Sequence, residues 1–341
     1  MLLILSILLY SSHALWFLFG CIWLLFWSIY QWQGWKSLIQ RLSPVIPMVI
    51  VSIIWFYLHT INVKEAGFTI GPYSFNSLFD RLTLGYFTNA LLGGIRGSVE
   101  PILLIIIFIW IIVSLITNRK QIKEKIDFPL LTIAGLFFLI FLFAPEAYVD
   151  TLYFSKRWFP IAMILFLLAI PVPTINKKWL YSVQFIMLVW FSVKTATAWS
   201  LYEKNELTGL KKSLNALPRN QWVLGLDFIK HSQYVKGRPF LQTFSYAQLL
   251  KGGDLNFTFV EHNSGIIRFK EMRKIEWTLN LEWNAEEVIN TDFMYFDYAL
   301  VNAEPQYHAY LSKVNFLRPV TFEGRWRLYK ILKIINHPSA P

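Results

Sequence analysis

Long apolar runs separated by short polar segments dominate the first 200 residues of the chain. A helix needs about 20 mostly apolar residues to cross a bilayer, because lipid leaves no backbone polar group unpaired. Residues 1–30 are apolar throughout, and Ser11-Ser12-His13 divides them into a short stub and a first span at 14–30. Further spans are predicted at 44–60, 101–117, 128–144, 158–174 and 179–200. The pattern predicts a polytopic α-helical membrane domain over residues 1–200, with about six transmembrane helices.

Two further segments depart from this pattern of spans. Near residues 73–92, apolar residues recur at near-helical spacing and predict an amphipathic helix on the outer leaflet. From Leu201 onward the composition becomes that of a soluble domain, with strands predicted at 222–228 and 326–332 among helical segments. The alternation predicts a small α/β domain over residues 201–336, followed by a flexible tail at 337–341.

The connecting loops differ in charge, and this difference predicts their sidedness. Basic residues cluster at 35–41, 119–125 and 177–178, whereas the intervening loops at 61–99 and 145–157 mix acids with bases. Cytoplasmic loops of membrane proteins carry an excess of Lys and Arg. We therefore expect a multi-pass protein of the inner (plasma) membrane whose mixed loops and C-terminal α/β domain are extracytoplasmic.

The composition supports a membrane protein and argues against several other classes. Of the 341 residues, 55% are hydrophobic and 16% charged, whereas soluble domains carry about 25% charged residues. The net charge of +11 would suit nucleic acid, but the bases lie mostly in short loops, where topology and anionic lipid account for them. The lipid bilayer is therefore the expected partner, and nucleic acid is not. The near absence of acids from the predicted spans also argues against an ion-coupled transporter.

The sequence offers little to bind a metal or a cofactor. Its six histidines form no pair at i,i+4 spacing, and its single cysteine, Cys21, lies in an apolar run. No nucleotide-binding glycine motif or nucleophile elbow is present. We expect neither a metal site nor a cofactor.

The outward loop at 144–160 carries the candidate binding residues. Arg157, helped by Lys156, could pair with a lipid-linked phosphate, because a guanidinium group matches phosphate geometry. Glu146 or Asp150 could orient a sugar hydroxyl or act as a base, with Trp158 at the same edge of the loop. The alternative is an ordinary interfacial loop in which Trp158 and Arg157 anchor a helix end. No catalytic residue is identified.

Several short motifs resemble those of one family. The run from Ser155 to Pro160, before an apolar helix that closes with Pro171 and Pro173, resembles the R-Y-x-x-P loop-to-helix junction of polytopic GT-C glycosyltransferases. The C-terminal region is similar to the outer domains of one branch of that superfamily. Its matching segments are 246–253, 296–301 and the Gly-Arg-Trp-Arg-Leu-Tyr run at 324–329. The resemblance implies transfer of a sugar from a polyprenyl-phosphate donor at the outer face of the membrane.

The chain departs from this family in one respect. The family places its catalytic acid in the first outward loop, and no residue of this sequence corresponds to that loop. Together with the stub before Ser11, this departure suggests the C-terminal part of a longer enzyme, not catalytic alone, whether a fragment, a split gene with a separate N-terminal half, or a degenerate copy. The alternative is a non-enzymatic envelope membrane protein whose outer domain binds a partner or a glycan.

Overall fold

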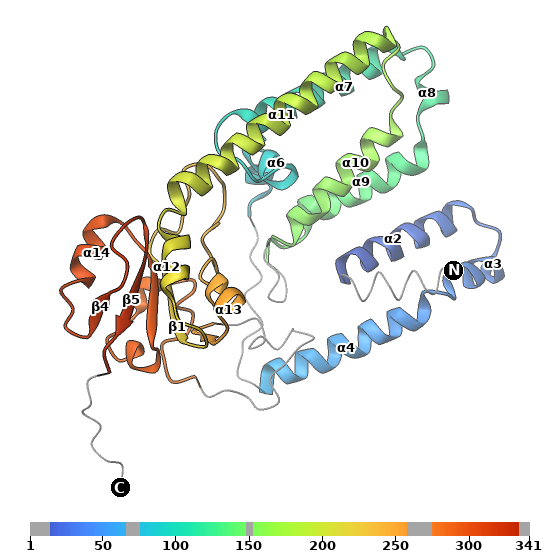
Figure 1. Cartoon of the computed structure of the whole chain (residues 1–341). Coiled ribbons are helices and arrows are strands. Elements are labelled where there is room, and N and C mark those ends of the chain that lie inside the picture. Colours follow the sequence, from blue (N-terminus) through green and yellow to red (C-terminus); the bar gives the residue numbers. More distant parts are fainter. Residues whose placement is uncertain (1–13, 66–75, 148–152, 258–274, 334–341) are drawn as a thin grey trace. The chain divides into compact units, whose positions relative to one another are not determined.

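The computed structural model of the chain describes residues 14–65, 76–147, 153–257 and 275–333 (Figure 1). The chain divides into two compact units. The first, called the helical unit below, comprises 1–92 and 101–183, and the second, the α/β unit, comprises 93–100 and 184–341. Each unit has its own hydrophobic core. The predicted flexible tail at 337–341 lies outside the described residues.

The helical unit is built around α9 (Phe128–Phe143) and α10 (Phe159–Ala169), which pack along each other. Its other elements are α2 (Ala14–Tyr30), α3 (Trp35–Leu42), α4 (Ile46–Glu65), α5 (Leu78–Arg81), α6 (Leu84–Leu91), α8 (Ile122–Lys125) and the 3-10 helix η1 (Ser155–Trp158), with most of α7 (Val99–Thr117) and the start of α11 (Lys177–Glu206). Phe137 and Phe141 of α9 are fully buried against Phe159 of α10 and Phe19 of α2. This core holds both ends of the loop between α9 and α10.

Among the residues that the structure describes, two helices, α7 and α11, are long and apolar enough to cross a membrane. The bent pair formed by α3 and the first half of α4 would make a third span, if it counts as one. Many apolar side chains of α11 are exposed, among them Phe185 at 66% and Leu188 at 64%. An exposed apolar surface of this kind is typical of a face that contacts lipid or another protein.

The prediction of about six spans is confirmed only in part. The apolar runs at 14–30 and 128–144 form the helices α2 and α9, of which the structure describes 17 and 16 residues, at the short end of the range for a membrane span. The run at 158–174 forms only the 11 residues of α10, because Pro171 and Pro173 cannot continue a helix. Instead, Asn118 donates to the Val172 carbonyl at 3.0 Å, and Thr117 accepts from the Thr174 amide at 3.2 Å. The end of α7 thus supports the extended segment that follows α10.

The predicted amphipathic helix near 73–92 overlaps two short helices in the structure. Ser77 and Thr83 are the N-cap residues of α5 and α6, and both have an extended backbone. Their side-chain hydroxyl oxygens accept hydrogen bonds from the backbone amides of Asp80 and Tyr86. Such caps satisfy backbone donors that have no partner in the first turn of a helix. Residues 66–75 lie outside the described part of the chain.

The α/β unit contains a five-stranded mixed sheet of order β2-β1-β3-β5-β4. Its strands are β1 (Trp222–Asp227), β2 (Asp254–Leu255), β3 (Tyr298–Asn302), β4 (Leu317–Pro319) and β5 (Trp326–Ile331). Strands β1, β2 and β3 run parallel, whereas β5 is antiparallel to both β3 and β4. The strands predicted at 222–228 and 326–332 are thereby confirmed, and so is a small α/β arrangement in this part of the chain.

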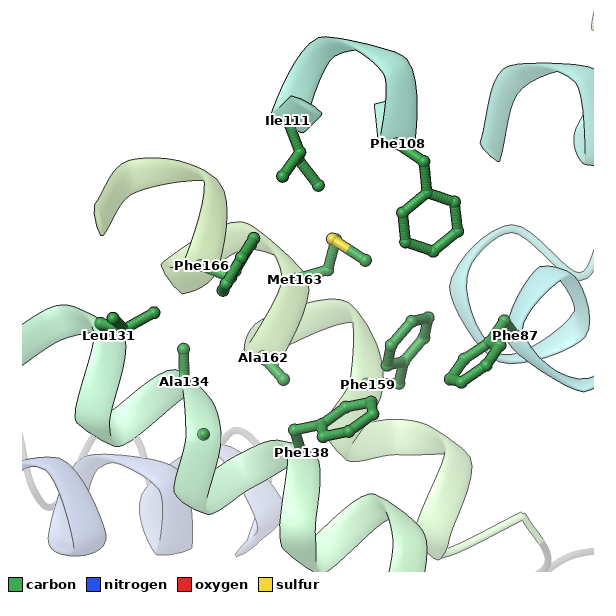
Figure 2. Close-up of a pocket in the computed structure, with 11 residues that line it drawn as sticks. Phe87, Phe108, Ile111, Leu131, Ala134, Phe138, Phe159, Ala162, Met163 and Phe166 are labelled. Carbon is green, nitrogen blue, oxygen red and sulfur yellow. The ribbon is translucent and has the colours of Figure 1, made fainter. Parts of the chain in front are cut away.

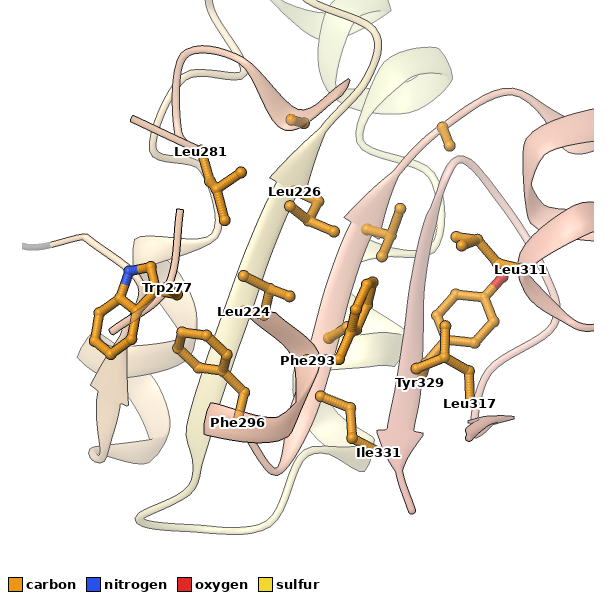
Figure 3. Close-up of a cluster of buried hydrophobic side chains, with 14 residues drawn as sticks. Leu224, Leu226, Trp277, Leu281, Phe293, Phe296, Leu311, Leu317, Tyr329 and Ile331 are labelled. Atoms are coloured by element: carbon orange, nitrogen blue, oxygen red, sulfur yellow. The ribbon is translucent and has the colours of Figure 1, made fainter. Parts of the chain in front are cut away.

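Both faces of the sheet are covered, so the strands are buried on both sides. One face packs Val223, Leu300 and Leu328 against the helices α12 (Leu210–Ala216) and α13 (Ser245–Lys251). The other face packs Leu224 and Leu226 beneath the helix α14 (Pro305–Leu311) and the short 3-10 helices η3 (Ala285–Glu287) and η4 (Asp292–Tyr295) (Figure 3). This double cover explains why β1 reads as a continuous apolar run and not as an alternating one.

The segment at 93–100, which leads into α7, belongs to the α/β unit. Ile95 pairs with Val235 in a short β-bridge, and the Arg96 amide donates to the Tyr234 carbonyl at 2.9 Å. The carboxylate of Glu100, which is buried, accepts from the Gly94 and Ile95 amides and forms an ion pair with Lys236 at 2.7 Å. These contacts fix the first turn of α7 to the α/β unit.

Candidate functional site

The loop between α9 and α10 is closed by backbone and helix-end contacts. The helix α9 stops at Ala144 because Pro145 follows, and the chain returns so that the Phe154 amide donates to the Glu146 carbonyl at 2.8 Å. The 3-10 helix η1 then leads directly into α10. This arrangement brings Glu146 next to Ser155 and Lys156. Asp150, a predicted binding residue, lies outside the described residues.

Glu146 is the centre of a half-buried polar cluster. Its Oε2 accepts from the Tyr86 hydroxyl at 2.6 Å and from Ser155 Oγ at 2.7 Å, and its Oε1 lies 2.7 Å from Lys156 Nζ. The side chains of Glu146 and Lys156 are 13% and 19% exposed. The ammonium group of Lys156 also lies 4.8 Å from the ring centres of Tyr86 and Tyr153. The structure therefore brings together two of the predicted residues, Glu146 and Lys156, as partners of each other.

The protonation states in this cluster follow from its contacts. Burial alone would raise the pKa of Glu146, but the hydrogen bonds from Lys156, Tyr86 and Ser155 together lower it below its ordinary value. Burial and the hydrogen bond to Glu146 raise the pKa of Tyr86 to about 12. At neutral pH the carboxylate is therefore ionised and the phenol is protonated. A carboxylate that already accepts from three donors is a weak base, so the cluster is suited to hold the loop in place.

Arg81 supports the same loop from beneath. It is 1% exposed, and its Nη1 donates to the carbonyls of Phe141, Leu142 and Ala144 at 3.0, 2.8 and 2.6 Å. These carbonyls belong to the last turn of α9, where a cation is favoured and where backbone acceptors have no helical partner. Arg81 thereby fixes the point at which α9 ends and the loop begins.

The other two predicted residues, Trp158 and Arg157, are not among the side chains that surround Glu146. Trp158 is 2% exposed, and its ring packs 4.5 Å from Phe19 and 5.5 Å from Phe137 between centres. It contributes to the core of the helical unit. Arg157, its neighbour in η1, is exposed at the surface. Arg157 is therefore the more exposed of the two predicted basic residues of this loop.

The helical unit contains an apolar cavity of about 410 Å³, a volume within the range of ligand pockets (Figure 2). Side chains from α6, α7, α9 and α10 line it: Phe87, Phe108, Ile111, Leu131, Ala134, Phe138, Phe159, Ala162, Met163 and Phe166, with Gly135. The lining has no charged group. Phe141 separates the cavity from the polar cluster, because its ring lies 5.5 Å from that of Tyr86 and 4.7 Å from that of Phe159.

Three residues of the cluster were missed in the sequence: Arg81, Tyr86 and Ser155. Tyr86 was visible only as part of an amphipathic pattern, and its partner Glu146 lies 60 residues away in the chain. Arg81 gave a usable signal, because an arginine among apolar residues at a helix end commonly caps carbonyl groups. That signal does not say which helix end it caps.

Comparison of the chain with protein-family models, with curated proteins and with solved structures gives no match. Among the residues that the structure describes, no group of three or more His, Cys, Asp and Glu side chains is placed to hold a metal ion.

Proposed function

We propose that the chain is a GT-C-like integral membrane glycosyltransferase, or its C-terminal portion, that works with a polyprenyl-phosphate-linked sugar. In this proposal the protein lies in the inner membrane, and the loop at 144–160 and the α/β unit lie on its outer face. The length and apolar character of α7 and α11 support membrane insertion.

One observation carries this proposal. An exposed cation, Arg157, stands at the entry to α10, and the same helix lines an apolar cavity of about 410 Å³. A polyprenyl phosphate has the matching pair of groups, a charged phosphate and an apolar chain. Lys156 forms an ion pair with Glu146 and would assist Arg157 through its charge. Arg157 would bind the phosphate, and the cavity would accept part of the chain.

The affinity of the purified chain for a fluorescent polyprenyl phosphate, measured in phosphatidylcholine nanodiscs, tests the head-group contact. Replacing Arg157 with Ala should weaken binding about tenfold or more, since hydrogen bonds to charged groups contribute about 1.5–3 kcal/mol. Lys178→Ala, which removes an exposed base elsewhere, should not change it. Binding of the phosphate-free polyprenol should be the same in all three proteins. Unchanged phosphate binding in Arg157→Ala would refute the role of this residue.

A second pair of variants tests the cavity. A Cβ added at Gly135 meets no atom within 4 Å, so Gly135→Leu should fold while its side chain fills space inside the cavity. Gly85 has equal room but does not line the cavity, which makes Gly85→Leu a matched control. We expect weaker binding of both the polyprenyl phosphate and the polyprenol in Gly135→Leu only. Equal affinities in the two variants would exclude the cavity as the site of the chain.

The orientation is tested by reporter fusions after Ser200. Activity of an extracytoplasmic reporter is expected there, and activity of a cytoplasmic reporter alone would overturn the proposed topology.

A non-enzymatic envelope protein whose outer unit binds a partner or a glycan is the second candidate. It is favoured by the saturation of the Glu146 carboxylate, which leaves that group no role as a base.

A further inference from the structure

The sheet of the α/β unit contains a switch point in its strand order. From β1 the chain continues to β2 on one side of β1, and it later returns to β3 on the other side. All three strands are parallel. In open parallel sheets, ligands bind outside the carboxyl ends of the two strands between which the order reverses. The carboxyl ends of β1 and β3 are therefore the place where this fold offers a binding site.

Polar side chains gather at this edge. Asp227 and Asn302, the last residues of β1 and β3, are register partners, and Asn302 Nδ2 donates to Asp227 Oδ1 at 2.8 Å. Arg325 immediately precedes β5, whose Trp326 pairs with Asn302. Arg325 Nη1 lies 3.4 Å from Oε1 of Glu206, the last residue of α11. The guanidinium group of Arg325 also lies 5.2 Å from the ring centre of Phe240, which supports its flat face.

Three buried atoms of this cluster have no hydrogen-bond partner within the described part of the chain. They are two acceptors, Asn302 Oδ1 and Glu206 Oε2, and one donor, Arg325 Nε. Asn302 is fully buried and Glu206 is 2% exposed, so these residues are desolvated by folding. Buried polar groups in folded proteins are nearly always paired, so these open atoms would gain a hydrogen bond from a bound water or a ligand. The side chain of Arg325 is 20% exposed, and this makes it the point of entry from solvent.

The charge balance of the cluster indicates the kind of ligand. The carboxyl groups of Asp227 and Glu206 lie with the guanidinium groups of Arg325 and Arg238. Burial raises the pKa of Asp227 above its ordinary value, and the hydrogen bond from Asn302 and the two arginines oppose this shift. An anion would be repelled by the two acids, and a cation by the two arginines. A hydroxyl group both donates and accepts, so several hydroxyl groups in one ligand can meet two open acceptors and one open donor together.

We propose that the carboxyl edge of β1 and β3 is a binding site for a neutral polyhydroxyl ligand, a sugar, with Asn302, Glu206 and Arg325 as its contacts. This site lies in the α/β unit and does not rest on the function proposed for the helical unit. Glu206 ends the helix α11, so an α11 that crosses the membrane would place the site next to the bilayer surface. In the outward orientation proposed above, glycans of the cell envelope would supply this sugar, and this source alone rests on the proposed function.

Binding is tested on the full chain in nanodiscs of phosphatidylcholine, because alkyl-glycoside detergents would themselves carry sugar. Saturation-transfer NMR with methyl glycosides of glucose, galactose, mannose and N-acetylglucosamine at millimolar concentration should detect at least one of them. Glu206→Gln should reduce that affinity about tenfold, because the amide replaces one of the open acceptors with a donor. Glu203→Gln, on the same helix and exposed, should leave it unchanged.

Asn302→Leu, of similar size, gives a second variant, with near-ultraviolet circular dichroism to establish that both variants remain folded. The proposal predicts that it also loses the glycoside signal. Absence of any glycoside signal from the unsubstituted chain would overturn the proposal. So would a glycoside affinity that Glu206→Gln leaves intact, or displacement of the bound glycoside by inorganic phosphate at equal concentration. None of these results depends on whether the chain binds polyprenyl phosphate.

Discussion

Replacing Glu146 with Ala is the sharpest test of how the loop between α9 and α10 is held. The substitution removes the acceptor of three hydrogen bonds at once, from Tyr86, Ser155 and Lys156. It also leaves the Lys156 ammonium group, 19% exposed, without its carboxylate. The side chain of Tyr86 belongs to a helix that is otherwise held by apolar packing. The loop and α6 should therefore both loosen.

The expected size of the effect follows from burial. Removing one partner of a fully buried ion pair costs about 3–5 kcal/mol, and a single hydrogen bond to a charged group contributes about 1.5–3 kcal/mol. Glu146 and Lys156 keep some contact with solvent, at 13% and 19% exposure, so water takes over part of the lost interaction. We expect Glu146→Ala to lower the free energy of unfolding by about 3 kcal/mol. The exposed Glu124→Ala in α8 should change it by less than about 0.5 kcal/mol.

A double-mutant cycle with Lys156→Met separates the ion pair from the other contacts. Removing both charges leaves no uncompensated ammonium group, so the double variant should be more stable than Glu146→Ala alone. A coupling energy of about 1–3 kcal/mol is expected for two residues in direct contact. Urea titration in detergent micelles, followed by near-ultraviolet circular dichroism, provides the four free energies. Strict additivity of the two substitutions would refute the assigned ion pair.

The pH dependence gives an independent check on the same residue. The pKa of Glu146 is lowered in the folded protein, so its contribution is present above its ordinary value of 4.5 and is lost as the pH falls through the folded value. The stability difference between the unsubstituted chain and Glu146→Ala should therefore be constant near neutral pH and should shrink in acid. A stability difference that does not shrink as the pH is lowered through the acid range would contradict the role of the ionised carboxylate.

Two further predictions concern the α/β unit. His308 is buried between the Tyr329 hydroxyl, 2.9 Å from Nδ1, and the Arg325 carbonyl, 2.8 Å from Nε2, and burial lowers its pKa below the ordinary 6.5. As the pH falls, the unfolded chain takes up a proton on His308 before the folded protein does. The free energy of unfolding should therefore decrease as the pH drops below about 6.5. In urea titrations, the decrease between pH 7.5 and pH 5.5 should be smaller for His308→Gln than for the unsubstituted chain. Gly253 has a φ of +85°, and a Cβ there would lie 2.0 Å from the Gln221 carbonyl oxygen. Gly253→Ala should therefore cost more than about 2 kcal/mol, whereas Gly237→Ala, with a similar φ and open space, should cost about 1 kcal/mol; equal losses would refute the steric part.

The elements of the α/β unit were predictable because their signals are local. The apolar run of β1 is bounded by polar residues, and Trp326 to Leu332 has the residue types of a strand. The order of the strands was not predictable, because it depends on pairing between residues far apart, such as Asn302 with Trp326. The proximity of Asp227 and Arg325, and hence the cluster at the carboxyl edge, follows from that order alone. No motif in the sequence marks it.

In the helical unit the apolar runs were visible, but their lengths as helices were not. The prediction treated residues 158–174 as one span, whereas the prolines after Ala169 end α10. Asn118, which directly follows α7, then donates a hydrogen bond to the Val172 carbonyl. The sequence also placed Trp158 at an interface, because tryptophan is frequent there. Its burial against Phe19 and Phe137 depends on how α2 packs on α9, which no local pattern records.

The two polar clusters differ in whether their carboxylate and amide oxygens already accept hydrogen bonds from side chains of the protein. In the loop cluster both carboxylate oxygens of Glu146 are occupied by side chains of the same unit, so a ligand would have to displace an internal partner. At the carboxyl edge, acceptors on Asn302 and Glu206 remain unused although folding has already removed them from water. Their desolvation cost is therefore incurred before any ligand arrives, and a ligand that supplies the missing hydrogen bonds gains their full strength. By this criterion the Glu146 carboxylate stabilises the loop on which Arg157 stands, whereas the carboxyl edge offers open acceptors to a partner. The buried unpaired atoms near the loop, Nε and Nη2 of Arg81 and Nε1 of Trp158, are donors only.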